Sequence, residues 1–172
     1  MTAKLMNLED LFVDQLRDVL YAERQITRAL PKMARGASST DLAQALTAHL
    51  KETEGQIDRL EKVFEELDLT ARGKKCEAIL GLIEEGQSLM EEEAEPEVLD
   101  AGIIASAQKV EHYEIAAYGC LVTWAEQLGH AKAAKLLQQI LDEEKAADVK
   151  LSGLAETVVN LEAAAPVGSS QG

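Results

Sequence analysis

A carboxylate lies in or beside the apolar stripe of each of four long segments with helical periodicity. Apolar residues at three- and four-residue steps surround Glu23, Glu52, Glu111 and Glu144 near the middle of these segments. Four buried carboxylates without counter-charges would repel one another, and their desolvation would cost several kcal/mol. The stripes carry no Lys or Arg. We therefore expect these glutamates to bind a pair of metal ions, and an oxygen-rich site with few nitrogens favours iron, with manganese as the alternative.

The ligand pattern departs from the usual one for dinuclear sites in helical bundles. In that pattern two helices each supply a Glu, and two others each supply Glu-x-x-His. Here Gly55 follows Glu52 by three residues and Ala147 follows Glu144 by three, so both histidines are missing. Three acidic or amide residues one helical turn from the expected ligands are candidate replacements: Gln56, Glu114 and Asp148.

Two further residues lie close to the expected site. His49 precedes Glu52 by three residues and shares its helix face, so it either binds a metal ion or orients Glu52 from behind. Tyr118 lies two turns beyond Glu111, which makes it the best-placed tyrosine for a supporting or redox role. Core packing with a satisfied hydroxyl is the alternative for Tyr118.

The composition predicts an all-α protein. Ala, Leu, Glu, Lys and Gln, which favour helices, dominate the chain, while aromatic residues make up 3% of it and Pro occurs three times. Alternation of apolar and polar residues between turns, which would indicate strands, is not convincing anywhere. With 172 residues the chain is long enough for one domain with a sizeable core.

Turn residues divide the chain into four long helices and one short one. The periodicity predicts the helices at about 8–34, 40–67, 75–92, 97–128 and 131–160. Short loops at Gly36 and Gly129 make two antiparallel hairpins, and a connection of roughly thirty residues with the short helix joins them. One long crossover between two hairpins predicts a ferritin-like four-helix bundle. The domain is expected to span residues 1–162, followed by a disordered tail at 163–172.

Several segments resemble the YciF-like ferritin-like family of bacterial stress proteins. These segments are YAERQITRALPKMAR, HLKETEGQIDRLEKVF, GLIEEG, SAQKVEHYEIAAYG and LDEEKAADVKL, and the similarity covers about residues 7–158. The resemblance implies a ferritin-like bundle, often dimeric, with a dinuclear metal site and no established reaction. It also implies a link to general and osmotic stress.

The net charge of −14 argues against some partners. An acidic surface repels nucleic acid and anionic membranes. Apolar runs of membrane-spanning length and a signal-peptide pattern are both missing from the sequence, so a cytoplasmic location is expected. We expect a homodimer, because the short helix and the region of Trp124 offer apolar surface beyond the needs of a four-helix core.

Three classes of function fit these features. The first is a di-metal oxidoreductase that acts on oxygen or peroxide, and the second is an iron-binding or storage protein. The third is a structural or protein-binding stress module with a vestigial metal site. Metal content and oxygen consumption would separate the first class from the third, and solution mass would identify a storage shell.

Overall fold

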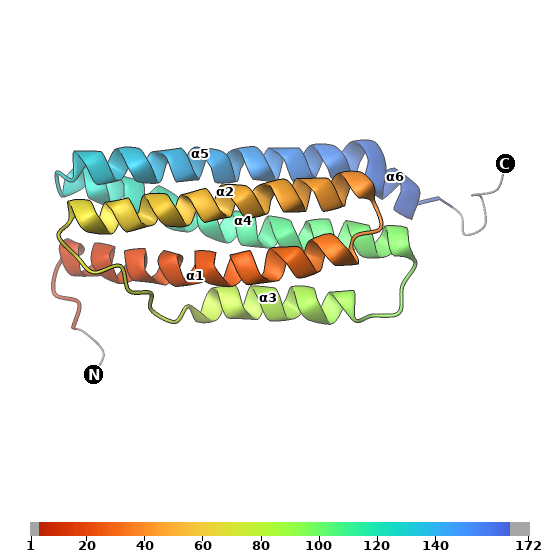
Figure 1. Cartoon of the computed structure of the whole chain (residues 1–172), viewed down its shortest axis with the longest axis horizontal. Coiled ribbons are helices and arrows are strands. Elements are labelled where there is room, and N and C mark those ends of the chain that lie inside the picture. Colours follow the sequence, from red (N-terminus) through yellow and green to blue (C-terminus); the bar gives the residue numbers. More distant parts are fainter. Residues whose placement is uncertain (1–3, 166–172) are drawn as a thin grey trace.

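The structure, a computed structural model, describes residues 4–165, and this part of the chain is helical without strands. The helices are α1 (Leu8–Gly36), α2 (Thr40–Glu66), α3 (Glu77–Met90), α4 (Pro96–Gln127), α5 (Ala131–Leu154) and α6 (Asn160–Ala163). The four long helices α1, α2, α4 and α5 form the bundle, and α3 lies along its outside within the long connection (Figure 1). The predicted fold, an all-α ferritin-like bundle with a short helix in its crossover, is confirmed.

Local sequence signals determine most helix ends. The Asn7 side chain accepts a hydrogen bond of 2.8 Å from the backbone N–H of Asp10, which caps α1. Ser39 caps α2 in the same way through the N–H of Leu42, at 3.3 Å. Gly129, with φ of +81°, makes the turn between α4 and α5, a conformation that glycine adopts without strain.

Two of the helices differ in detail from their predicted ranges. The third helix is shorter than expected, because Cys76 precedes it as its cap and Glu91 ends it. The last predicted helix is interrupted: α5 ends at Leu154, a π-helical turn covers Ala155–Val159, and α6 follows. Of the predicted tail, residues 166–172 lie outside the described residues, and α6 itself ends at Ala163. The domain limits therefore stay a prediction.

The apolar core of the bundle consists of two clusters, one in each half. One cluster contains Phe12, Leu60, Leu121 and Leu137, and the other contains Leu30 with residues of α2 to α5. Along α2, α4 and α5, most of the buried polar residues lie between the segments that supply these two clusters: His49, Thr53, Gln56, Glu111, Glu114 and Glu144. The bundle thus carries a polar layer between two dry halves, where the polar groups are shielded from water on both sides.

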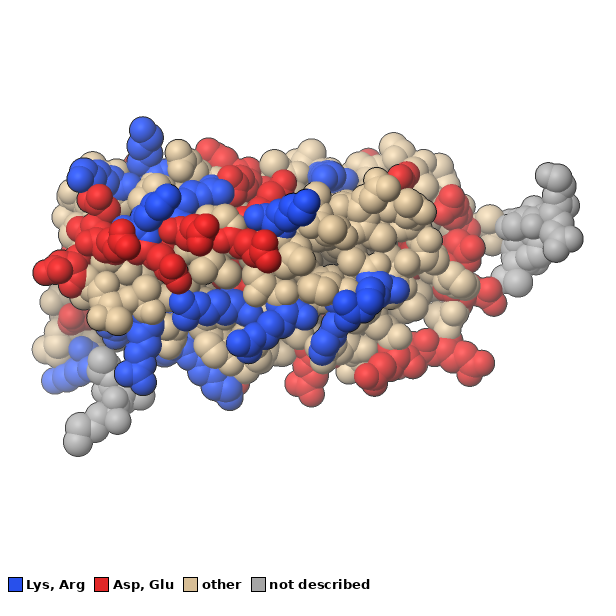
Figure 2. All heavy atoms as spheres, in the orientation of Figure 1, with Lys and Arg blue, Asp and Glu red and all other residues tan. Residues whose placement is uncertain are grey.

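The surface is charged but not divided by sign on the face shown in Figure 2. Acidic and basic side chains are interspersed there, and the net charge of −14 does not form one continuous acidic patch on that face. Within the described residues, none of the helices has the length and apolar character needed to cross a membrane.

A buried aspartate joins the α1–α2 loop to α4. Asp100 is 2% exposed, and its carboxylate accepts hydrogen bonds from the backbone N–H groups of Ser38 and Ser39, at 2.8 and 2.7 Å. It also accepts a bond of 2.6 Å from the Ser38 hydroxyl. Because charge-assisted bonds to buried backbone groups are strong, this carboxylate holds the loop against the start of α4.

Asp100→Asn is expected to destabilise the protein by about 2 kcal/mol, because the amide offers one acceptor oxygen and leaves a loop N–H without its partner. Chemical denaturation measures the change. Asp58→Asn, at an exposed position of α2, is the matched control and should leave the unfolding midpoint unchanged. Equal midpoints for the two variants would contradict the assigned role of Asp100.

Candidate metal centre

Four buried side chains converge in the polar layer of the bundle. His49 of α2, Glu111 and Glu114 of α4, and Glu144 of α5 each offer a ligand atom, and these atoms all lie within 4.8 Å of one another. The four residues are between 0 and 8% exposed. They come from three helices, and the three-residue spacing of Glu111 and Glu114 places both on one face of α4. Such a group could hold a metal ion.

The α1 helix adds a fifth carboxylate beside these four. Glu23 is 0% exposed, and its Oε1 accepts a short hydrogen bond from the hydroxyl of Tyr118. Besides burial and the Tyr118 hydrogen bond, the charges of His49 and Glu111 affect the pKa of Glu23, as expected for a carboxylate beside this cluster. Tyr118 is itself 0% exposed, so its hydroxyl is available only to this cluster. Its predicted position near the carboxylates is therefore what the structure shows.

Most ligand atoms of the cluster have no hydrogen-bond partner in the protein. The buried atoms without a normal hydrogen bond include Glu23 Oε2, His49 Nε2, Gln56 Oε1, Glu111 Oε2, Glu114 Oε1 and both carboxylate oxygens of Glu144. An unsatisfied buried polar group costs roughly 1–3 kcal/mol, so native proteins rarely collect several at one point. All but one of these atoms are oxygens. A set of oxygens with a single imidazole nitrogen fits iron or manganese.

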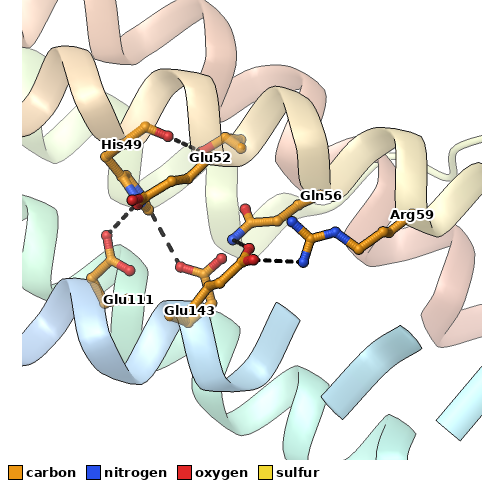
Figure 3. A network of polar contacts seen from close by, with 8 residues as sticks. His49, Glu52, Gln56, Arg59, Glu111 and Glu143 are labelled. Atoms are coloured by element: carbon orange, nitrogen blue, oxygen red, sulfur yellow. Dashed lines mark hydrogen bonds and ion pairs between the residues drawn. The ribbon is translucent and has the colours of Figure 1, made fainter. Parts of the chain in front are cut away.

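His49 is the one basic group inside the cluster. Its Nε2 lies 3.1 Å from Glu111 Oε1 and 4.0 Å from Glu144 Oε2, and its Nδ1 lies 3.4 Å from Glu52 Oε2 (Figure 3). Burial disfavours the charged imidazolium, but the contacts with Glu111 and Glu52 outweigh burial and raise the pKa of His49 to about 10. In the metal-free protein at neutral pH, a protonated His49 therefore occupies the position of a cation.

Several of the acids have pKa values raised above their usual range. Burial, the proximity of Glu111 and nearby charges raise the pKa of Glu144 to about 10. Burial is also the main reason that the pKa of Glu23 rises to about 7, and burial with the charges of Glu23 and Glu144 raises that of Glu114 well above its usual range. The protein thus neutralises the metal-free cluster with protons, which a metal ion would have to displace.

A second layer of contacts positions Gln56. Its Nε2 donates a hydrogen bond of 3.2 Å to Glu143 Oε2, and Arg59 Nη1 lies 2.7 Å from Glu143 Oε1 (Figure 3). Glu143 thereby ties the amide nitrogen down and leaves the buried Gln56 Oε1 free as an acceptor. Neither Glu143 nor Arg59 was among the site residues predicted from the sequence. Their link joins α2 to α5 across 84 residues, and the one local signal is the position of Arg59 three residues after Gln56.

Two of the residues predicted from the sequence lie outside the convergent group. The side chain of Glu52 is 49% exposed and contacts the outer nitrogen of His49. His49 therefore faces the cluster and Glu52 lies behind it. This is the reverse of the alternative in which Glu52 binds the metal ion and His49 orients it. Asp148 is engaged elsewhere, by Gln108 Nε2 at 3.1 Å and His112 Nε2 at 3.3 Å. Of the expected ligands, the structure brings together Glu111, Glu114 and Glu144, with Glu23 and Gln56 adjacent.

A family of proteins matches almost the whole chain. The family described as Domain of unknown function (DUF892) matches residues 7–164. The protein belongs to this family. Protein YciF of Escherichia coli (strain K12) is 53% identical to it over 160 residues, which are 92% of this chain and 96% of YciF. The resemblance to YciF-like proteins is thereby confirmed.

Solved structures show the same fold. The crystal structure of the E. coli stress protein YciF matches with a TM-score of 0.87 at 53% identity, and covers 91% of this chain and 99% of that one. YcfI of Rhodopseudomonas palustris, described as a candidate structural protein, matches with a TM-score of 0.86 at 51% identity, over 88% of this chain and 97% of its own. This DUF892 protein is therefore a YciF-like bundle with a buried histidine–glutamate cluster.

Proposed function

We propose that this chain binds two metal ions, iron in preference to manganese, in the cluster of His49 and the buried glutamates, and that the loaded centre reacts with oxygen or peroxide in the bacterial stress response. The single observation that supports this most strongly is the set of unpartnered buried oxygens around His49. A pair of ferrous ions would supply the two electrons that, with two protons, convert dioxygen to hydrogen peroxide, or hydrogen peroxide to two waters.

The residues of the chain have separate tasks in this proposal. Glu23, Glu111, Glu114 and Glu144 hold the metals, together with His49 Nε2 and Gln56 Oε1. Tyr118 holds one oxygen of Glu23 through its hydroxyl and leaves the other oxygen free. Glu52 contacts the outer nitrogen of His49 and keeps the imidazole ring oriented, as carboxylates do for histidine ligands in metal sites.

Anaerobic loading with ferrous iron or manganese, followed by elemental analysis, tests the proposal. We expect two metal ions for each chain of the wild type, and oxygen or peroxide consumption by the iron-loaded protein. Glu126→Gln, at an exposed position of α4, is the control and should bind as the wild type does. A protein that takes up no metal under these conditions would favour the structural or protein-binding module, the function suggested by the description of YcfI.

Arg59→Gln is expected to weaken metal binding without unfolding the bundle. The variant removes the ion pair that holds Glu143, so that the Gln56 amide is free to turn its oxygen away from the site. Loss of such supporting contacts typically lowers metal affinity by about 10–100-fold. Competition with a chelator measures the affinity. An unchanged affinity would remove Gln56 from the proposed ligands.

The assembly is a separate part of the proposal. We propose a homodimer in which α3 contributes to the contact. This helix lies on the outside of the bundle (Figure 1). Some of its apolar side chains are only half-buried. Light scattering tests it, and a monomer would contradict it. A shell of many subunits would instead support iron storage.

A further inference from the structure

An apolar cavity lies between α1, α3 and α4 and ends at the metal centre. Its walls include Ile26 and Leu30 of α1, Ile83 of α3 and Val110 of α4. It is also lined by His49 and Glu111, whose Nε2 and Oε1 atoms lie 3.1 Å apart in the cluster. The lining also includes the exposed Lys32, so the cavity reaches from the surface to the ligand atoms.

The size and the lining of this cavity limit its occupant. Its volume is about 30 Å³. A water molecule needs roughly 10–15 Å³ of such volume and several polar partners, and apolar cavities without these partners stay dry. The walls away from His49 and Glu111 are mainly aliphatic, so water is poorly held there. The space therefore suits a diatomic, uncharged molecule and is too small for an organic substrate.

A second, smaller cavity on the other side of His49 has a different character. It has a volume of about 20 Å³, lies between α2, α4 and α5, and is lined by Glu52 and Lys150 as well as by His49 and Glu111. The His49–Glu111 pair thus separates an apolar space from one with charged side chains at its edge. A cation or a hydrogen-bonding molecule is better accommodated on the charged side, because an apolar wall leaves polar groups without partners.

We propose that the apolar cavity beneath α3 is a dioxygen-binding site that supplies the metal centre. This inference rests on the proposed function, since it names the oxidant of the same centre and the face by which it arrives. Hydrogen peroxide carries two hydroxyl groups that the aliphatic walls cannot satisfy, so the cavity selects dioxygen over peroxide. The helix α3 has a task in this arrangement: it supplies one apolar wall next to a centre that the four long helices alone would leave more open.

Xenon binding tests the cavity without any metal. Xenon is apolar and occupies small dry cavities. In crystals of the metal-free, full-length protein under xenon pressure, we expect a xenon atom between Leu30, Ile83 and Val110. Ala29→Leu adds bulk to the cavity wall and should abolish this peak, whereas Ala45→Val, in the wall of the second cavity, should retain it.

A second variant with a smaller change to the same cavity keeps the test valid if Ala29→Leu does not fold. At Gly86 an added Cβ would lie 3.4 Å from Ser106 Cβ, an ordinary contact, so Gly86→Ala narrows the cavity without a clash. It should lower the occupancy of xenon. With ferrous iron bound, each cavity variant should lower the ratio of the oxidation rate with dioxygen to the rate with hydrogen peroxide.

The outcomes separate this inference from the proposed function. If iron binds and is oxidised but xenon finds no site in the cavity, the inference fails while the proposed function stands. If both cavity variants lose xenon yet keep the wild-type rate ratio, delivery through the cavity is wrong. If xenon binds as expected but the wild type takes up no metal, the proposed function fails and the supply role falls with it.

Discussion

Replacing Glu144 with glutamine is expected to leave the metal-free protein at least as stable as the wild type at neutral pH, and to remove most of its stabilisation by ferrous iron. Burial, Glu111 and Glu23 raise the pKa of Glu144 to about 10, so its carboxyl group is protonated at neutral pH and has the shape and charge of the glutamine amide. In the folded state the substitution then exchanges one neutral group for another, and the variant no longer has to take up a proton on folding. In contrast, the amide cannot supply the anionic oxygen that a metal ion requires.

Melting curves with and without ferrous iron measure both effects. A ligand at about 100 times its dissociation constant stabilises the folded state by about 2.7 kcal/mol, which raises the melting temperature of a chain of this size by roughly 5–10 °C. We expect this rise in the wild type and in the control Glu126→Gln, and little of it in Glu144→Gln. Strong destabilisation of metal-free Glu144→Gln would mean that Glu144 forms a structural ion pair, since breaking a buried pair costs several kcal/mol.

Raising the pH above neutral is expected to destabilise the metal-free protein and to tighten metal binding. The pKa values of Glu144 and His49 are both about 10 in the folded state, above the ordinary values of 4.5 and 6.5. The folded state therefore binds more protons than the unfolded state in this range. The stability that these groups contribute is fully present below their ordinary pKa values and is lost as the pH rises towards about 10, by about 1.4 kcal/mol per pH unit for each proton.

Chemical denaturation of the metal-free protein across the neutral to alkaline range checks the sign of this dependence. Glu144→Gln should flatten the curve, because one of the titrating groups of the cluster is gone. Metal affinity should rise over the same range, because the protons of Glu144 and His49 must leave before their atoms can act as ligands. Calorimetry in buffers of different ionisation enthalpy measures the protons released. Stability that rises with pH, or binding without proton release, would contradict the assigned protonation states.

The two predictions share a physical cause. Three of the buried acids have raised pKa values because burial penalises their charge, and the neighbouring carboxylates add to it. Burying such a cluster without a bound ion costs folding free energy. The apolar clusters on either side of it give no structural reason for its presence. The acids whose charged form is most penalised by burial are also the ones whose oxygens have no hydrogen-bond partner. A site at which a metal ion displaces protons requires this combination.

Local sequence signals determined the helices and three of the site glutamates. Caps such as Asn7 and Ser39 act over a few residues, and an apolar stripe needs only its own helix to be recognised. Glu23, Glu111 and Glu144 lie in the centre of their stripes, and all three are buried in the structure. A residue in the centre of a stripe still faces the core if the helix rotates about its axis by a few tens of degrees. The sequence alone was therefore enough for these positions.

Tertiary packing decided the residues at the edges of the stripes. His49 and Glu52 lie on neighbouring positions of one helix face, and a small rotation of α2 decides which of them enters the core and which stays half exposed. Packing of α2 against α1 and α5 sets that rotation. The contact of Glu143 with Arg59 depends in the same way on how α5 lies against α2. The cavity beneath α3 exists because of the space left between three packed helices, which no single helix encodes.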